Sequence, residues 1–327
     1  MTIIVDAFGA DSYENVIDGI GDALEEIKDV KIIAVGDEEI IKQRLDGREL
    51  DLARLEIINA TEVIHHDDSP VMSLRRKKDS SMCVSYRTLR DREDTAALLS
   101  AGNTGALIAG AHLLLGRRDG VDSLTLATLL PTVTGDYTLL TDCGANVDCR
   151  ATHLLEFARL GSEYARGVLG KESPRVALLS VGTEDTKGNA LSKEAFAALR
   201  ESGLNFVGNI EAKTLLSGEV DVIVTDGFPG NVALKSVEGV ASSVVGILLS
   251  LLKKYAPEGA DLSFVKDAVG AFMTRYDFNS QGGAMILGAK KPVVKMHGSA
   301  NRRTVVSSVR QAVRMARGMK AVNIDFG

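Results

Sequence analysis

Short apolar segments alternate with longer amphipathic segments along almost the whole chain. The apolar segments have the length and composition of buried strands, and they cover residues 3–5, 31–35, 55–58, 96–99, 137–140, 176–180, 205–207, 220–224 and 293–296. The helix-like segments cover residues 14–27, 81–92, 104–115, 152–166, 191–201, 232–252, 262–273 and 303–319. This alternation predicts an α/β fold with a Rossmann-like, doubly wound and mostly parallel sheet.

The chain gives no sign of division into separate domains. It has 327 residues, and its six prolines are scattered singly. No internal repeat, low-complexity tract or linker interrupts the alternation, and 45% apolar with 25% charged residues is ordinary for a globular protein. We therefore expect one α/β domain over residues 1–327.

Charge and cysteine content exclude several classes of protein. A net charge of −6 and the absence of tryptophan argue against a nucleic-acid binder. The three cysteines, Cys83, Cys143 and Cys149, have neither metal-binding nor CxxC spacing, which fits a reducing compartment. We also expect no signal peptide and no segment with the roughly 18–20 apolar residues that span a bilayer, and hence a cytoplasmic protein.

Four loops between predicted strands and helices combine glycine with small polar residues. They are SAGNTGAL (100–107), TDCGANVD (141–148), SVGTEDTKGN (180–189) and TDGFPGNVALK (225–235). Such loops gather at the carboxyl ends of parallel strands, where glycine lets the backbone approach an anion and helix N-termini attract negative charge. The loops therefore predict a shared site for an anionic ligand.

Familiar signatures of other enzyme classes are missing from these loops. The sequence has no GxxxxGK[ST] phosphate loop, no GxGxxG dinucleotide fingerprint and no GxSxG nucleophile elbow. Its five histidines show no zinc spacing. A nucleotide hydrolase, a dinucleotide-dependent dehydrogenase and a zinc enzyme are all disfavoured.

The residues of these motifs and their order along the chain resemble those of the PlsX-type phosphate acyltransferases over nearly the whole chain. The matching segments are VDAFGAD (5–11), RRKKDSSM (75–82), SAGNTGAL (100–107), DCGANVD (142–148), VGTEDTKGN (181–189), TDGFPGNVALK (225–235), GGAMILG (282–288) and HGSAN (297–301). The sequence departs from the family where Phe8, Gly9 and Ala10 replace Met-Gly-Gly, and where Ala300 replaces a second serine. Neither departure touches the loop that carries Lys187.

The resemblance implies a reaction in which a long-chain acyl-(acyl carrier protein) and inorganic phosphate give acyl phosphate and free carrier protein. It implies a fold related to isopropylmalate dehydrogenase and phosphotransacetylase, a homodimer, and no metal or redox cofactor. The product would pass to a membrane glycerol-3-phosphate acyltransferase. Related enzymes associate peripherally with membranes.

The resemblance also assigns roles to loop residues. Lys187 and Asn231 match the pair required for activity. Substrate-binding positions would be Asn103, Thr104, Gly105, Asn146, Gly182, Thr183, Asp185 and Gly230. Phosphate is already largely dianionic near neutral pH, so its attack on a thioester does not need a strong general base. The site must instead balance the charge of phosphate, hold it in position and stabilise the carbonyl oxyanion. We expect Asp185 and Glu184 to orient Lys187 or to cap the next helix.

Alternatives remain for these residues. Lys187 can be a solvated loop charge and Asn231 a helix N-cap. Cys143 is a rival nucleophile, although no cation lies near it in sequence to lower its pKa. An acetyl-CoA:phosphate acetyltransferase, a decarboxylating dehydrogenase and a non-catalytic anion-binding scaffold are the rival functions.

Two segments predict binding surfaces. The last helix carries a stripe of Arg303, Arg310, Arg314 and Arg317, which suits an acidic carrier protein but is equally consistent with an ordinary exposed face. Residues 240–276 predict a helical hairpin, broken at 257–259. We expect it to pack in the core or in a dimer, or to place its tip in a membrane interface.

Overall fold

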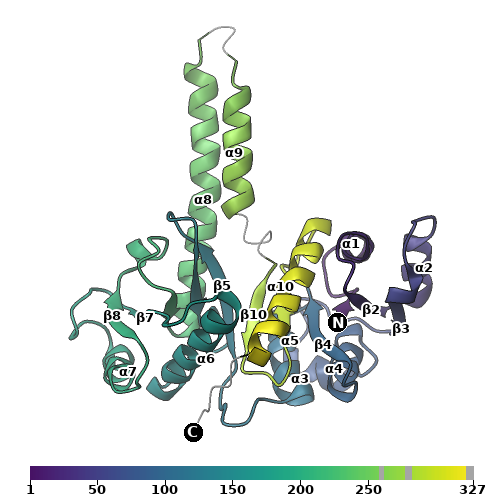
Figure 1. Ribbon diagram of the computed structural model, residues 1–327, viewed down its shortest axis with the longest axis horizontal. Helices are drawn as coiled ribbons and strands as arrows, with labels where there is room; N and C mark the ends of the chain where they lie inside the picture. Colours follow the sequence, from purple (N-terminus) through teal and green to yellow (C-terminus); the bar gives the residue numbers. More distant parts are fainter. Residues whose placement is uncertain (258–260, 277–281, 322–327) are drawn as a thin grey trace.

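A computed structural model describes residues 1–257, 261–276 and 282–321 (Figure 1). Eleven strands of this part form one sheet in the order β3-β2-β1-β4-β11-β10-β5-β6-β9-β7-β8. The strands are β1 (Thr2–Asp6), β2 (Lys31–Gly36), β3 (Leu55–Asn59), β4 (Thr95–Ser100), β5 (Thr125–Pro131), β6 (Tyr137–Thr141), β7 (Val176–Leu179), β8 (Phe206–Ile210), β9 (Val222–Val224), β10 (Ala284–Leu287) and β11 (Val293–Lys295). The prediction of an α/β fold with a mostly parallel sheet is confirmed.

The helices cover both faces of this sheet. The α-helices are α1 (Tyr13–Glu26), α2 (Glu38–Leu45), α3 (Pro70–Arg76), α4 (Ser81–Asp91), α5 (Thr104–Gly110), α6 (Ala151–Leu169), α7 (Ala190–Arg200), α8 (Gly227–Tyr255), α9 (Ser263–Tyr276) and α10 (Arg302–Ala321). Short turns of helix add η1 (Leu52–Arg54), η2 (Ala111–Leu115) and η3 (Ala212–Thr214). The sequence analysis missed α2 and α3, and it missed β5 and β10.

The two missed strands change the direction of the sheet. Strands β3, β2, β1, β4 and β11 are parallel to one another, and so are β6, β9, β7 and β8. Between these groups, the steps from β11 to β10, from β10 to β5 and from β5 to β6 are all antiparallel. Three reversals leave the two parallel groups running in opposite directions. The register of the central strands brings the carboxyl ends of β11 and β6 level with each other, because Lys295 pairs with Ala284, the next residue Met285 pairs with Ala127, and Ala127 pairs with Thr141.

Alternating side chains divide the core into two layers. Ile3 and Val5 of β1 pack on the face covered by α1, α2, α6, α7 and α10. Ile4 packs on the other face, with α3, α4, α5 and the buried Leu234 of α8. On this second face, α5 follows β4 of the first parallel group, and α8 follows β9 of the second. The central strands β10 and β5 lie between these two helices.

The arginine stripe of α10 is paired with acids that are distant in the sequence. The Arg310 guanidinium lies 2.6 Å from Glu26, and that of Arg317 lies 2.6 Å from Asp29. The neighbouring Arg302 lies 2.5 Å from Asp22. Arg310 and Arg317 are therefore compensated, because α1 packs beside α10 and supplies Glu26, and the segment after α1 supplies Asp29. Contact of the stripe with a carrier protein stays a prediction. Arg303 and Arg314 are exposed and form no ion pair within the described residues.

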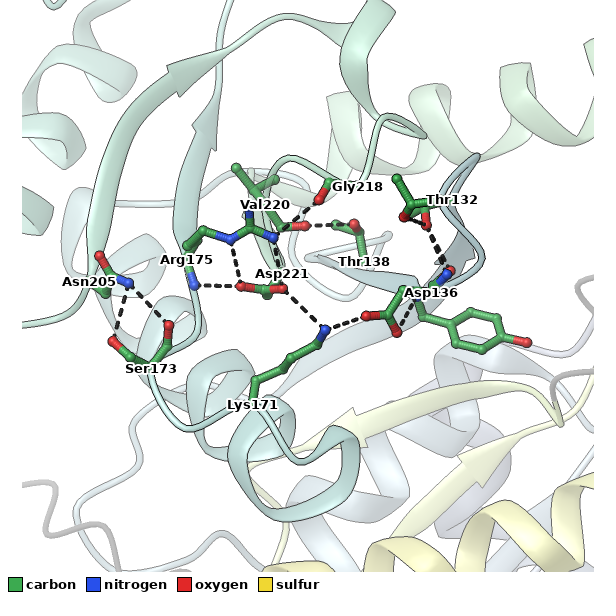
Figure 2. Close-up of polar contacts among 12 residues, drawn as sticks. Thr132, Asp136, Thr138, Lys171, Ser173, Arg175, Asn205, Gly218, Val220 and Asp221 are labelled. Carbon is green, nitrogen blue, oxygen red and sulfur yellow. Dashed lines mark hydrogen bonds and ion pairs between the residues drawn. The ribbon is translucent and has the colours of Figure 1, made fainter.

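Charged residues connect the amino ends of three strands in the second parallel group (Figure 2). Arg175, just before β7, donates from its backbone nitrogen and its guanidinium to Asp221, just before β9. Lys171 pairs with Asp136, just before β6. Burial alone would raise the pKa of Asp221, but the hydrogen bonds and charge of Arg175 bring it below its ordinary value. The cluster ties together the strand ends that lie away from the central loops.

The hairpin predicted for 240–276 is present, and α8 carries it beyond the body of the protein (Figure 1). Its large apolar side chains are exposed, including Val244 at 53%, Ile247 at 60% and Phe264 at 68%. Packing in the core of the protomer is therefore a wrong prediction for most of α8, although Val265 of α9 is buried. Residues 258–260 and the side chain of Met273 lie outside the described residues.

The expectation that no segment has the length and composition of a bilayer-spanning helix is also wrong. Helix α8 has 29 residues and is apolar enough to cross a membrane, and 6% of its most apolar stretch is buried. The apolar sequence reaches this length because glycine, alanine and serine join the larger residues into one helix. By itself this is weak grounds for a membrane span, since the first turns of the same helix are built into the site described below.

Candidate active site

A cavity of about 350 Å³ lies over the centre of the sheet, between α5 and α8. Its floor includes Thr128 of β5, Ala284 of β10 and Lys295 of β11, and its wall includes Asn231 of α8. We call this the central cavity. It forms here because the short antiparallel strands separate the two helices on this face.

The loop after β6 is organised around the carboxylate of Asp142, which is fully buried. One oxygen accepts hydrogen bonds from the backbone nitrogens of Leu126, Gly144 and Ala145, at 2.9, 3.3 and 3.1 Å. The other accepts from the backbone and side-chain nitrogens of Asn146, at 2.7 and 3.0 Å. These bonds attach the loop to β5 and fold it under the start of α8.

Glycines let the start of α8 lie directly on this loop. A Cβ atom at Gly230 would stand 1.8 Å from the backbone oxygen of Asp142, and one at Gly227 would stand 2.5 Å from that of Asn146. At the other side of the cavity, a Cβ atom at Gly105 would stand 2.7 Å from Pro70. Gly105 and Gly230 thus allow close packing of protein on protein, and their part in substrate binding stays a prediction.

Two predicted phosphate donors have their side chains engaged within the protein. The Asn103 amide nitrogen donates to the backbone oxygens of His65, His66 and Asp68, and its oxygen accepts from Ala106 at the start of α5. The Asn146 amide nitrogen donates to Leu124 and Asp142. Both amides hold loops in place, so we do not place them on the phosphate. Thr104 does line the central cavity.

The loop with Lys187 lies outside the central cavity. The Lys187 side chain is 50% exposed, and its ammonium lies 3.9 Å from the Glu184 carboxylate. Asp185 pairs with Arg200, and Asn189 caps α7. Of the two acids, Glu184 is thus the one beside Lys187, as the sequence analysis allowed, whereas Asp185 is directed elsewhere. Gly182 is buried and Thr183 is exposed.

A second cavity of about 520 Å³ adjoins this loop, and we call it the lateral cavity. Gly188 and Asn189, next to Lys187, line it together with Thr225 and Pro229. Phe228 lines both cavities. The two predicted catalytic residues therefore lie on different sides of the turn that begins α8, with Asn231 in the central cavity and Lys187 beside the lateral one.

The sequence analysis missed a buried cation in the central cavity. Lys295 is 9% exposed and ends β11, and its ammonium donates to the backbone oxygens of Ala101 and Met296. No carboxylate of the described residues lies within ion-pair distance of it. Since an ammonium has three hydrogens, one remains for the cavity. Burial lowers the pKa of Lys295 to about 8.

A signal for Lys295 was present in the segment PVVKMHG. Lys295 stands two residues after the buried Val293, so strand alternation places it on the same face of the sheet, where a lone lysine is unusual. His297 also lines the cavity, and burial followed by the charges of Lys235 and Lys295 lowers its pKa. The acid that lines the cavity, Glu238, is 2.7 Å from Lys235.

Cys143 is a poor nucleophile in this structure. The thiol is buried, and its sulfur lies 3.3 Å from the backbone oxygen of Leu140. Burial and the nearby charge of Asp142 raise its pKa well above the ordinary value. A thiol that stays protonated does not attack a thioester, so the arrangement disfavours covalent catalysis through Cys143.

The chain is similar to acyltransferases over nearly its full length. Residues 1–322 match the model of the family described as fatty acid synthesis protein. The chain is 44% identical over 317 residues to the phosphate acyltransferase of Bacillus licheniformis, covering 96% of this chain and 94% of that one. It is 36% identical over 326 residues to the phosphate acyltransferase of Clostridioides difficile, covering 99% and 95%.

Solved structures with the same fold include a phosphotransacetylase and a phosphotransacylase. EutD phosphotransacetylase from Staphylococcus aureus has a TM-score of 0.64 at 16% identity, covering 98% of this chain and 94% of that one. A branched-chain phosphotransacylase from Enterococcus faecalis has a TM-score of 0.61 at 16% identity, covering 97% and 99%. At this identity the likeness establishes the fold alone.

The packing of α8 on the Asp142 loop gives a first prediction. Gly230→Ala should lower the free energy of unfolding by about 1–3 kcal/mol, because the new methyl group overlaps a backbone oxygen that cannot move freely. Gly239→Ala in the same helix is the control: open space surrounds that position, so alanine should raise stability by about 0.5–1 kcal/mol. Urea unfolding followed by circular dichroism measures both, and equal effects would contradict the packing argument.

Proposed function

The chain belongs to the phosphate acyltransferase family, it transfers an acyl group to inorganic phosphate for phospholipid synthesis, and from this premise we propose how its residues carry out the transfer. The donor is a long-chain acyl-(acyl carrier protein), and the product is an acyl phosphate. The observation that carries the proposal is the central cavity, where the buried Lys295 and the amide of Asn231 line one space over the middle of the sheet.

The central cavity is suited to a phosphate dianion. Its cationic lining comes from Lys295 and Lys235, with His297 beside them, and Glu238 is already paired with Lys235. A buried ammonium with a spare hydrogen can balance the charge of phosphate at low dielectric, where such interactions are strong. Thr104 and Asn231 add uncharged hydrogen-bonding groups.

The reaction needs positioning and charge stabilisation more than proton abstraction. A phosphate oxygen attacks the thioester carbonyl carbon, the new carbon–oxygen bond forms, and the carbon–sulfur bond breaks. The thiolate of the carrier takes up the proton that hydrogen phosphate loses, so the step balances without a cofactor. Asn231 donates a hydrogen bond to the carbonyl oxygen as this oxygen gains negative charge. Lys187, on the exposed loop beside the lateral cavity, approaches the same oxygen when substrate binds.

The partners follow from the donor and the product. The acidic carrier protein is expected to meet exposed cations, of which Arg303 and Arg314 remain unpaired on α10 among the described residues. Arg310 and Arg317 take part only if their exposed ion pairs with Glu26 and Asp29 break, which costs little at the surface. The acyl phosphate is consumed by a membrane glycerol-3-phosphate acyltransferase, and the enzyme works as a homodimer.

A direct assay tests the reaction. The protein is incubated with palmitoyl-(acyl carrier protein) and phosphate, and acyl phosphate is trapped with hydroxylamine as the hydroxamate. Formation of hydroxamate that depends on phosphate supports the proposal. Release of free carrier protein at the same rate without phosphate would show a thioesterase instead.

The catalytic pair gives a second prediction. Lys187→Ala and Asn231→Ala should each reduce kcat by about 10²–10³ while the circular dichroism spectrum stays unchanged, because each removes a donor that is used in the transition state. Lys193→Ala, in the adjacent helix α7, is a matched control and should retain activity. Two fully active variants would refute the assigned roles.

The buried lysine gives a third prediction, on pH. Lys295 has a pKa of about 8, so it is charged below this pH and neutral above it. The value of kcat/KM for phosphate should therefore fall about tenfold per unit as pH rises beyond 8, since phosphate itself is already dianionic there. Lys295→Arg keeps its charge at these pH values and should lose this decline, whereas Lys235→Arg should keep it. An unchanged decline in Lys295→Arg would assign the titration to another group.

The exposed hairpin supports peripheral contact with a membrane. Leu248 and Leu251 are 47% and 46% exposed, and Lys253 and Lys254 follow in the last turn of α8. Apolar side chains followed by lysines fit an interface with anionic lipid headgroups. The length of α8 does not make it a spanning helix in this proposal, because its first turns form the wall of the central cavity.

Vesicle sedimentation gives the fourth prediction. Leu248→Glu combined with Leu251→Glu should reduce sedimentation with phosphatidylglycerol vesicles at least tenfold, since burying two leucines contributes about 3–6 kcal/mol gross. The control, Leu52→Glu with Leu113→Glu, makes the same charge change at exposed leucines away from the hairpin and should sediment normally. If the hairpin variant instead becomes monomeric in light scattering, the hairpin is a dimer interface.

A further inference from the structure

The lateral cavity is lined mainly by apolar side chains, and its polar lining residues are Ser180, Asn189, Ser192, Thr225, Asp226 and Ser236. Leu178 and Leu179 of β7 form one part of the lining, Leu191 of α7 and Leu215 after η3 form others, and Val237 of α8 closes it. A cavity of about 520 Å³ is within the range of sites that hold small molecules. No part of the phosphate chemistry described above needs an apolar space of this size.

The apolar lining continues out of the cavity along α8. Ala233 and Val237 line the cavity, and Val240, Val244, Ile247 and Leu251 follow at steps of three or four residues, which places them along one side of the helix. These four side chains are 46–61% exposed. An apolar chain that lies in the cavity therefore has an apolar surface leading to it.

The inner end of the cavity reaches the catalytic residues. Gly188 and Asn189 of the Lys187 loop line it, and so does Phe228, which also lines the central cavity. A thioester carbonyl held at Phe228 would stand between the Lys187 loop and Asn231, with phosphate in the central cavity on its far side. This is the arrangement that acyl transfer between two bound substrates requires.

We propose that the lateral cavity binds the fatty acyl chain of the donor, with its carboxyl end at Phe228 and its methyl end directed along α8. This inference rests on the proposed function, since that function supplies the acyl chain. The number of methylenes that the cavity buries then sets the preference for long over short acyl chains. A side chain that fills part of the cavity lowers this preference.

The test narrows the cavity with Ala233→Leu on α8 and, separately, with Ala212→Leu on η3. In each variant the ratio of kcat/KM for palmitoyl to that for octanoyl donors should fall at least tenfold, because each displaced methylene costs about fourfold. Ala241→Leu makes the same exchange in α8 outside the cavity and should leave the ratio unchanged. If one variant fails to fold by circular dichroism, the other decides.

Binding of the fluorescent fatty acid cis-parinaric acid provides a readout that does not depend on turnover. The native protein should bind it, and Ala233→Leu should weaken binding at least tenfold. Equal loss for all chain lengths, or unchanged parinaric acid binding in both variants, overturns the proposal while acyl phosphate formation still stands. Binding that responds to Ala233→Leu, in a protein that forms no acyl phosphate from any donor, would uphold the cavity and refute the proposed function.

Discussion

The buried carboxylate of Asp142 is the interaction on which the architecture of the site depends. It accepts hydrogen bonds from β5 and from three residues of its own loop, so it fixes both the end of β6 and the surface on which α8 begins. A buried carboxylate is stable only when its oxygens are satisfied in this way. Because α8 starts against this loop, the position of Asn231 follows from the position of Asp142.

The central strands supply the other half of the site. Two antiparallel strands, β10 and β5, reverse the direction of the sheet and bring the carboxyl ends of both parallel groups to its centre. Lys295 reaches the cavity from β11, next to β10, where it is buried and donates to two backbone oxygens. The reversal thus places Lys295, from the first parallel group, opposite the first turn of α8, which follows the second parallel group.

Helix α8 links the chemistry to the surface. Its first three turns line both the central and the lateral cavities, and its exposed outer part carries the apolar side chains of the hairpin. One rigid element therefore spans the phosphate site, the proposed acyl site and the proposed membrane contact. A substitution at Ala233 therefore acts on the proposed binding of the acyl chain, whereas one at Leu251 of the same helix acts on the proposed membrane contact.

The sequence by itself determined the α/β class, most strands and helices, and the loops that surround the site, because the 2-residue and 3.6-residue periods and the glycine-rich turns are local properties of the chain. It also identified Asn231, which lies in the central cavity. It could not show that the Asn103 amide binds backbone oxygens and the Asn146 amide binds Leu124 and Asp142, that Gly230 serves packing, or that α1 and the segment after it supply acids to Arg310 and Arg317. Nor could it reveal Lys295 as a buried cation or the exposure of the hairpin. Each of these depends on groups that are distant in the sequence, and only the paired strands and packed helices bring such groups within a few ångströms of one another.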